Sequence, residues 1–338
     1  MILDRWQRPL GHLRISVTDR CNLRCAYCMP EPDYVWLPKT TLLTFEELER
    51  VTRLFARLGV RHVRLTGGEP LLRAQVSDLT ARLAAIGALD DLAMTTNGVL
   101  LAAQATRLRD AGLRRITVSL DTLHRSRFEA LTRRDHLADV LAGIDAAVTA
   151  FGTIKIDTVL MRGVNDDEIE ALVAFAGERR AEIRFIEYMD VPGATHWAAS
   201  TVVSRAEILE RLADAFGDVD TLPPEGPAPA SRYRLASGQV FGIIASTTAP
   251  FCSTCDRLRL TADGHLFSCL YATRGLDIRT PLRAGASDED LIDLFTRTWQ
   301  QRADRGAEAR LSAPDRSAFI AVADLRRAPQ LEMHTKGG

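Results

Sequence analysis

All six cysteines of the chain fall into two groups of three. The groups are Cys21, Cys25, Cys28 and Cys252, Cys255, Cys269. A short loop can bring three thiols to one small inorganic centre, and soft thiolates select zinc, copper(I) or an iron–sulfur cluster. A closed structural zinc site takes four ligands, and no fourth cysteine or histidine stands near the first group. A 4Fe–4S cluster held by three cysteines leaves one iron open for chemistry.

The second cysteine group has a rival explanation. Cys252, Cys255, His265 and Cys269 have zinc-ribbon-like spacing and supply the four ligands of a structural zinc site. His265 directly follows Asp263-Gly264, so it could instead belong to a hairpin turn. Spacing alone leaves both explanations open.

The run Gly67-Gly68-Glu69-Pro70 follows an apolar segment and precedes a helical pattern. Two glycines let the backbone approach a ligand closely, and the adjacent carboxylate could accept a hydrogen bond from an ammonium group. A tight turn that needs a positive φ angle is the alternative.

Composition limits the possible functions. The chain has 338 residues, of which 46% are hydrophobic and 26% charged, with a net charge of −1. This length suits one large barrel with an appendage, or two ordinary domains. The balanced charge does not indicate nucleic-acid or membrane binding, and neither a signal core nor a membrane span is recognisable. We expect a cytoplasmic protein whose reduced thiols serve metals, with no nucleic-acid and no membrane partner.

Short apolar runs alternate with longer helical patterns from Leu13 to about Glu187. The expected strands are 13–18, 62–66, 92–96, 115–120, 154–159 and 182–187. A helix over 45–58 has Thr44 as its N-cap and Glu47 to complete a capping box. Six βα units in series favour a parallel sheet, which is either open and doubly wound or barrel-like.

Polar residues recur where the expected strands end, which is typical of the loops around the mouth of a TIM-type barrel. We therefore expect an α/β fold with an incomplete (βα)6 TIM-type barrel over residues 1–221. A proline-rich segment, 222–230, opens a C-terminal α+β extension over 222–338. Turn signals predict antiparallel hairpins over 232–244 and 257–268, followed by a helix near 288–301.

The CxxxCxxC spacing of the first group, together with the GGEP run, resembles the radical S-adenosylmethionine superfamily. This resemblance implies that the open iron of a 4Fe–4S cluster binds the amino and carboxylate groups of S-adenosylmethionine. It implies contacts to that cofactor from the backbone of Tyr27 and from Gly68, Ser119 and Met189.

Several motifs together resemble a narrower family, the GTP 3′,8-cyclases of molybdenum-cofactor biosynthesis. They are LRISVTDRCNLRCAYCMP from Leu13, RLTGGEPLL from Arg64, FIEYMD from Phe185, FCSTCDRLRL from Phe251 and the terminal Gly337-Gly338. The resemblance covers essentially the whole chain. It implies a second 4Fe–4S cluster on Cys252, Cys255 and Cys269, whose open iron faces the guanine of bound GTP.

The same resemblance implies which residues contact the substrate GTP. They are Arg14, Arg64, Thr95, Lys155, Arg184, Arg257, Leu258 and Arg259. A buried cation without a partner is costly, and a triphosphate needs several cations, so we expect the strand cations to point inward near the strand mouths. An orientation outward into water is the alternative for any one of them. His62 departs from the family, which usually has a basic residue there, and Gly337-Gly338 would be a flexible tail that enters the active site.

The family implies a radical reaction. One electron cleaves S-adenosylmethionine to methionine and a 5′-deoxyadenosyl radical, which removes hydrogen from C3′ of the GTP ribose. The carbon radical then adds to C8 of guanine, and one electron and one proton complete 3′,8-cyclo-7,8-dihydro-GTP. The family also implies an external one-electron reductant, a homodimer, and transfer of the product to cyclic pyranopterin monophosphate synthase. Two alternatives are another radical S-adenosylmethionine enzyme with an auxiliary cluster, such as a peptide or sulfatase maturase, and a structural zinc protein.

Overall fold

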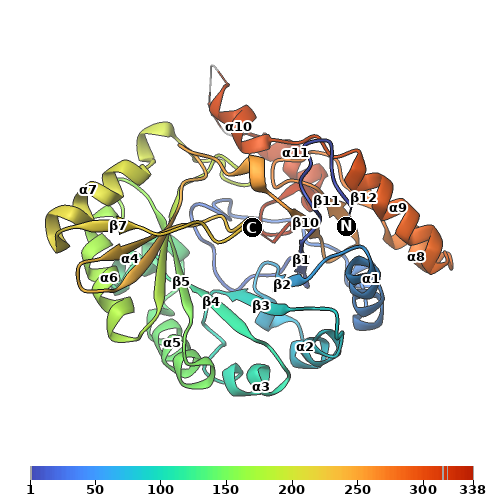
Figure 1. The fold of residues 1–338 in the computed structure, drawn as a ribbon, viewed down its shortest axis with the longest axis horizontal. Helices are drawn as coiled ribbons and strands as arrows, with labels where there is room; N and C mark the ends of the chain where they lie inside the picture. The colour runs from blue at the N-terminus through green and yellow to red at the C-terminus, as the bar shows by residue number, and fades with distance from the viewer. Residues whose placement is uncertain (1, 314–315, 318, 338) are drawn as a thin grey trace.

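A computed structural model describes residues 2–313, 316–317 and 319–337. Its centre is one twelve-stranded sheet with the order β12-β11-β10-β1-β2-β3-β4-β5-β6-β9-β8-β7. The strands from β10 to β9 in this order all run parallel. The sheet curves like a barrel wall, and helices cover its outer face (Figure 1). The two edge strands, β12 and β7, do not pair, so the barrel is incomplete.

The first half of the chain builds six βα units, which confirms the expected partial barrel. Its strands are β1 (His12–Ser16), β2 (His62–Thr66), β3 (Asp91–Thr96), β4 (Arg115–Ser119), β5 (Lys155–Leu160) and β6 (Glu182–Glu187). The helices after the first five strands are α1 (Phe45–Arg57), α2 (Val76–Ala84), α3 (Ala105–Asp110), α4 (Arg125–Thr132) with α5 (Leu137–Phe151), and α6 (Ile169–Glu178). The helix after β6 is α7 (Arg205–Phe216). The predicted capping box is present at α1, where the Thr44 side chain accepts a hydrogen bond from the backbone of Glu47.

The second half of the chain extends the same sheet. After α7 (Arg205–Phe216) come β7 (Val219–Thr221), β8 (Ser231–Leu235), β9 (Val240–Ile244), β10 (Arg257–Leu260), β11 (His265–Phe267) and β12 (Leu276–Asp277). Both expected hairpins are confirmed, because β8 pairs antiparallel with β9 and β10 pairs antiparallel with β11. However, β9 also adds to β6, and β10 adds to β1. Residues 245–256 therefore carry the chain from one side of the six-unit sheet to the other.

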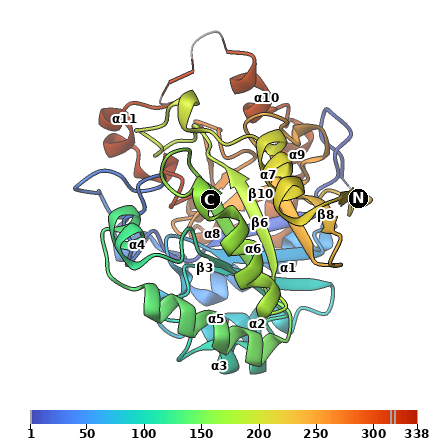
Figure 2. The same ribbon diagram turned by 90° about the vertical axis from the view of Figure 1, so that its left-hand side faces the viewer.

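Four helices complete the extension: α8 (Arg279–Arg283), α9 (Asp288–Gln300), α10 (Gly306–Leu311) and α11 (Val322–Arg327). The turned view shows α10 and α11 at the opposite end of the molecule from α3 (Figure 2). The predicted helix near 288–301 is α9, and it packs on α1 through stacked rings of Phe55 and Phe295 with centroids 4.4 Å apart. Among the described residues, no helix has both the length and the apolar character that crossing a membrane requires.

Replacing Phe295 with alanine tests how far this contact stabilises the fold. Its side chain is 1% exposed, so Phe295→Ala removes a buried ring and leaves a cavity between α1 and α9. We expect a loss of about 3–5 kcal/mol in the free energy of unfolding, measured by urea denaturation. Asp293→Ala, at an exposed position of the same helix, should change it by less than about 0.5 kcal/mol. Equal effects of the two substitutions would contradict this account.

Candidate active site

A cavity lies among the loops that follow the strands, and both cysteine groups line it. Cys21, Cys25 and Cys28 reach it from the loop after β1, and Cys252, Cys255 and Cys269 reach it from the extension. The residues that the sequence assigned to S-adenosylmethionine also line it, namely Tyr27, Gly68, Ser119 and Met189. The fold thus brings together two groups of thiols that are far apart in the sequence.

The loop that carries the first cysteine group is held against the double glycine. The backbone N–H of Gly68 donates to the carbonyl of Thr18 at 2.8 Å, and that of Glu69 donates to the carbonyl of Arg20 at 2.7 Å. A Cβ atom on Gly68 would lie only 2.2 Å from the Arg20 carbonyl oxygen. Only glycine therefore allows the two loops to approach this closely.

The carboxylate of Glu69 has a different role from the one the sequence suggested. It is completely buried, and it accepts hydrogen bonds from the backbone of Leu71 at 3.0 Å, from Thr96 Oγ1 at 2.7 Å and from the backbone of Asn97 at 2.7 Å. Burial raises its pKa to about 7. Three donors within the protein occupy its oxygens, so Glu69 connects two loops. Gly68 lines the cavity and Glu69 does not.

The thiols of the first group lie in apolar surroundings. Burial raises the pKa of Cys21 to about 11, and it also raises the pKa values of Cys25 and Cys28. Nearby polar groups fix the loop, since Tyr27 donates to Asp121 at 2.8 Å and Asn97 Nδ2 lies 3.8 Å from Cys21 Sγ. Thiolates in such a site need a positive centre beside them, so this donor set fits an iron–sulfur cluster.

The second cysteine group has a more cationic environment. Burial opposes ionisation of Cys255, but the charges of Arg257 and Arg302 outweigh it and lower the pKa of that thiol. Burial raises the pKa values of Cys252 and Cys269. The arginines compensate negative charge on one side of this group, so its thiolates also fit a metal cluster.

The zinc-ribbon alternative does not match the position of His265. Its Nδ1 atom lies 3.1 Å from Asp263 Oδ2, within the hairpin, and the residue does not line the cavity. Across the described residues, no three His, Cys, Asp or Glu side chains converge on a site the size of one ion. A cluster is larger than one ion and accepts more widely spaced thiolates.

A second cavity adjoins the first and is rich in cations. Six arginine or lysine side chains line it against three carboxylates. The cations are Arg14, Arg64, Arg115, Lys155, Arg184 and Arg257, and the carboxylates are Asp91, Asp157 and Glu225. Arg14, Asp157 and Arg257 line both cavities, so the two spaces lie next to each other.

The strand register places Arg14, Arg64 and Arg259 side by side at one level of the sheet. Arg14 is paired with Arg64 on one side and with Arg259 on the other. Because side chains alternate along a strand, neighbours in register point to the same face. Lys155 is the first residue of β5 and Arg257 the first of β10, whereas Arg14 and Arg64 stand at the middle of their strands. These cations therefore lie deeper in the barrel than the strand mouths where we expected them.

Several of these partly buried cations have no carboxylate partner among the described residues. Arg184 and Lys155 lie 2.7 and 3.9 Å from Glu182 Oε1. By contrast, within the described part of the chain no carboxylate oxygen lies within 4.0 Å of the following side chains: Arg14, Arg64, Arg257 and Arg259. Burial lowers the pKa values of Arg64 and Arg259 to about 10. Uncompensated buried charge is costly, so this cavity favours an anionic ligand.

The remaining predicted substrate residues differ in their positions. Thr95 lines the first cavity and accepts a hydrogen bond from Arg64 at 2.9 Å. Leu258 lines neither cavity, and its side chain is buried in the core, so only its backbone could contact a ligand. His62 stacks on His12 with ring centroids 4.4 Å apart, and burial lowers its pKa. His62 is therefore neutral at pH 7 and adds no cation.

The C-terminal tail enters the site. The buried amine of Lys336 donates to the carbonyls of Leu270 at 3.1 Å and Ala272 at 2.7 Å. The carbonyl of Gly337 accepts hydrogen bonds from Arg14 at 3.0 Å and Arg259 at 2.7 Å. Gly337 has a φ of +69°, and a Cβ there would lie 2.3 Å from Thr66 Cγ2. Gly338, the other predicted tail residue, lies outside the described residues.

Sequence reasoning did not single out five polar residues of this region, namely Asn97, Asp121, Asp157, Arg302 and Lys336. Asn97 and Asp121 belong to the polar residues at strand ends, and Asp157 stands at the inward alternate position after Lys155, so a signal existed for these three. Arg302 and Lys336 carried no local signal, because their burial depends on distant parts of the chain.

Comparison with known families matches both halves of the chain. Residues 15–176 match the Radical SAM superfamily, and residues 181–308 match the family Molybdenum Cofactor Synthesis C. A Mycobacterium tuberculosis protein named GTP 3′,8-cyclase 1 is 51% identical over 100% of this chain and 95% of its own length. Mycobacterium bovis GTP 3′,8-cyclase 3 is 52% identical over 100% and 90%. Staphylococcus aureus GTP 3′,8-cyclase is 41% identical over 91% and 93%.

A solved structure with the same fold is that of Streptococcus suis SuiB bound to S-adenosylmethionine. It has a TM-score of 0.59 and 15% sequence identity, and the match covers 90% of this chain and 68% of SuiB. At this identity the likeness concerns the fold, and it agrees with the parallel partial barrel.

The contact between the two loops can be tested through Gly68. Gly68→Ala forces a methyl group against the Arg20 carbonyl, and we expect the free energy of unfolding to fall by about 1–3 kcal/mol. Gly87→Ala is the matched control, because no heavy atom lies within 4 Å of a Cβ added there. Urea denaturation of both variants measures the difference, and an unchanged Gly68→Ala protein would show that the loops do not need glycine.

Proposed function

This chain belongs to the GTP 3′,8-cyclase family, and on that basis we propose that it converts GTP to 3′,8-cyclo-7,8-dihydro-GTP, the first step of molybdenum-cofactor biosynthesis. It is a radical S-adenosylmethionine enzyme. One observation carries the substrate assignment: the cavity lined by both cysteine groups adjoins the cavity rich in cations, and Arg14, Asp157 and Arg257 line both. Such a space suits a ligand with a base at one end and a triphosphate at the other.

The first cysteine group would hold a 4Fe–4S cluster with S-adenosylmethionine bound to its open iron. When bound, this pair supplies a 5′-deoxyadenosyl radical as the hydrogen-abstracting species. Gly68, Ser119, Met189 and the backbone of Tyr27 line the space beside the thiols. Their role is to orient the cofactor and to exclude water, which would otherwise compete for reactive intermediates.

The cations would hold the triphosphate of GTP. Arg64, Lys155 and Arg184 line only the second cavity, so they are placed for the phosphates. Arg14 and Arg257 line both cavities and are placed for the middle of the nucleotide. Guanidinium groups suit this task because they make charge-assisted, often bidentate, hydrogen bonds with phosphate oxygens.

The second cysteine group and the tail would complete the site around guanine. A second 4Fe–4S cluster on Cys252, Cys255 and Cys269 would bind the base, with Thr95, Arg259 and the backbone of Leu258 as further contacts. Holding the base and the ribose together keeps C3′ and C8 within bonding reach, which is a proximity effect. The tail residues Gly337 and Gly338 would close the site, and the Arg14 and Arg259 contacts to the Gly337 carbonyl support that placement.

Further parts of the proposal concern organisation and partners. We assign the S-adenosylmethionine chemistry to residues 1–221 and substrate recognition to residues 222–338. The reaction needs an external one-electron reductant. We also propose a cytoplasmic homodimer that passes its product to cyclic pyranopterin monophosphate synthase. A peptide or sulfatase maturase is less suitable, because a peptide substrate gives no reason for four partly buried arginines that have no carboxylate partner among the described residues.

Anaerobic incubation with GTP, S-adenosylmethionine and a reductant tests the function. We expect 5′-deoxyadenosine to accumulate with GTP and not with ATP, because the second cysteine group must bind guanine. Cys25→Ser provides the inactive control, since it removes one ligand of the first cluster. Production of 5′-deoxyadenosine at the same rate without any nucleotide would argue against GTP as the substrate.

Arg64→Ala tests the placement of the triphosphate. Losing one charge-assisted hydrogen bond of about 1.5–3 kcal/mol should weaken GTP binding about ten- to hundredfold, measured by calorimetry on the anaerobic protein. Binding of guanosine, which has no phosphates, should change little. Arg234→Ala, at an exposed position of β8, should leave both affinities unchanged. An equal loss for GTP and guanosine would place Arg64 elsewhere on the ligand.

A further inference from the structure

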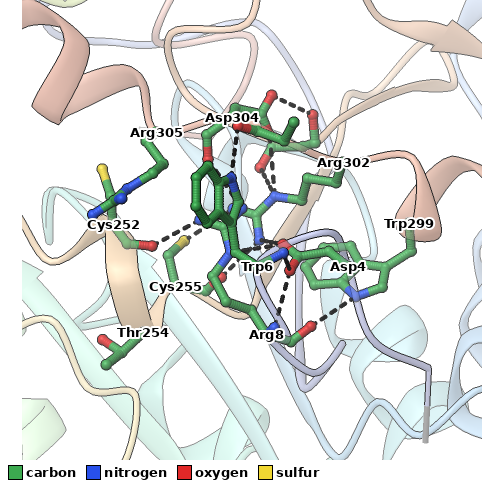
Figure 3. A network of polar contacts seen from close by, with 12 residues as sticks. Asp4, Trp6, Arg8, Cys252, Thr254, Cys255, Trp299, Arg302, Asp304 and Arg305 are labelled. Carbon is green, nitrogen blue, oxygen red and sulfur yellow. Dashed lines mark hydrogen bonds and ion pairs between the residues drawn. The ribbon is translucent and has the colours of Figure 1, made fainter.

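A network of buried charges surrounds the second cysteine group. It joins residues near the start of the chain, Asp4 and Arg8, with Arg302 and Asp304, which follow α9 (Figure 3). The Asp4 carboxylate accepts from Arg8 Nε at 2.6 Å and from Arg302 Nη1 at 3.3 Å. One carboxylate thus pairs with two arginines from opposite ends of the sequence.

Arg302 contacts the second cysteine group directly. Its Nη1 donates to the carbonyl of Cys255 at 2.7 Å, and its Nη2 donates to Cys255 Sγ at 3.4 Å. Its Nε donates to the carbonyl of Ser268, beside Cys269, and to Asp304 Oδ2, both at 3.1 Å. The residue is 4% exposed, and its guanidinium lies 4.6 Å from the ring centroid of Trp299. Every nitrogen of the guanidinium is therefore engaged.

Arg8 supports the other end of the Cys252–Cys255 turn. Its Nη1 donates to the carbonyl of Cys252 at 2.7 Å, and its Nη2 donates to the carbonyl of Asp304 at 3.0 Å. The two arginines thus hold the backbone of both cysteines, while Asp4 and Asp304 balance their charge. Such a satisfied network of buried polar groups restricts the geometry of the groups it holds.

Contacts between arginine and cysteine sulfur are not distributed evenly. Throughout the described residues they occur at Cys255 alone, from Arg302 at 3.4 Å and from Arg257 at 3.8 Å. Arg257 also lines both cavities, where the proposed substrate binds. Arg302 lines neither, so its contact with Cys255 serves the cysteine and not the ligand.

We propose that Arg302 is a positioning residue, which holds Cys255 as a ligand of the second cluster and raises the reduction potential of that cluster. Net charge and hydrogen bonds to sulfur set the potential of an iron–sulfur centre, and groups outside the ligand set orient the ligands. A cation with an N–H donor on a cluster thiolate stabilises the reduced, more negative state. The inference rests on the second cluster of the proposed function.

The test isolates the second cluster in a protein that carries Cys21→Ser, Cys25→Ser and Cys28→Ser. Iron and sulfide are counted after anaerobic reconstitution, and the reduction potential is then measured by titration followed by electron paramagnetic resonance. We expect Arg302→Gln to shift the potential to a more negative value and to change the resonance spectrum. Arg305→Gln is the matched control: it removes the same charge nearby, but Arg305 packs on Trp6 and pairs with Glu308 without contacting a cysteine.

A second variant covers the case in which Arg302→Gln does not fold. Arg302→Lys keeps the charge but has no planar fork, so we expect a smaller negative shift or a partial loss of iron with an unchanged circular dichroism spectrum. The proposal is wrong if an Arg302 variant that folds has the same reduction potential and the same iron content as Arg305→Gln. If the triple-serine protein binds no iron, the second cluster of the proposed function is wrong. If it binds a cluster whose reduction potential does not change on substitution of Arg302, only the role of Arg302 is wrong.

Discussion

The site depends on positive charge that is partly buried inside the barrel and that exceeds the negative charge of the described residues around it. Arg14, Arg64, Arg257 and Arg259 have no carboxylate partner among the described residues, and their neighbours offer carbonyl and hydroxyl oxygens instead. Burial therefore lowers the pKa of Arg64 to about 10. A fold tolerates such a cluster when a ligand supplies the missing charge, and a triphosphate is a ligand of that kind. The same excess of positive charge in the interior therefore makes it suitable for a triphosphate such as GTP.

The topology explains how this interior comes to face two loops that carry cysteines. The six βα units alone would form a curved sheet with two exposed edges, and β9 and β10 cover those edges as additional parallel strands. The segment between them crosses the open side of the barrel and carries Cys252 and Cys255 with it. As a result both cysteine groups line one cavity, and β10 adds Arg257 and Arg259 to the sheet beside β1. Figure 1 shows β10 next to β1.

The two cysteine groups differ in their electrostatic surroundings, which suits different tasks. The thiols of the first group are buried, and Asp121 lies near Cys25. Burial raises the pKa values of Cys21 and Cys25. Arg257 and Arg302 lie beside Cys255 in the second group, and their charges lower the pKa of that thiol. A low reduction potential makes a cluster a better reductant of S-adenosylmethionine. Positive charge near a cluster makes it a better binder of an electron-rich base. The proposed division of roles between the two groups follows this difference.

Local patterns in the sequence determined the alternation of strands and helices, the capping box at Thr44, the two hairpins and the two cysteine groups, because each depends on residues close together in the chain. The tertiary structure alone decided which strand lies beside which, and with it the depth of Arg64 and Lys155 inside the barrel. It turned Glu69 away from the cavity, placed Asp157 between the cations, and buried Arg302 and Lys336 beside the second cysteine group. Those outcomes depend on contacts between distant segments, and no pattern within a short window of sequence records such contacts.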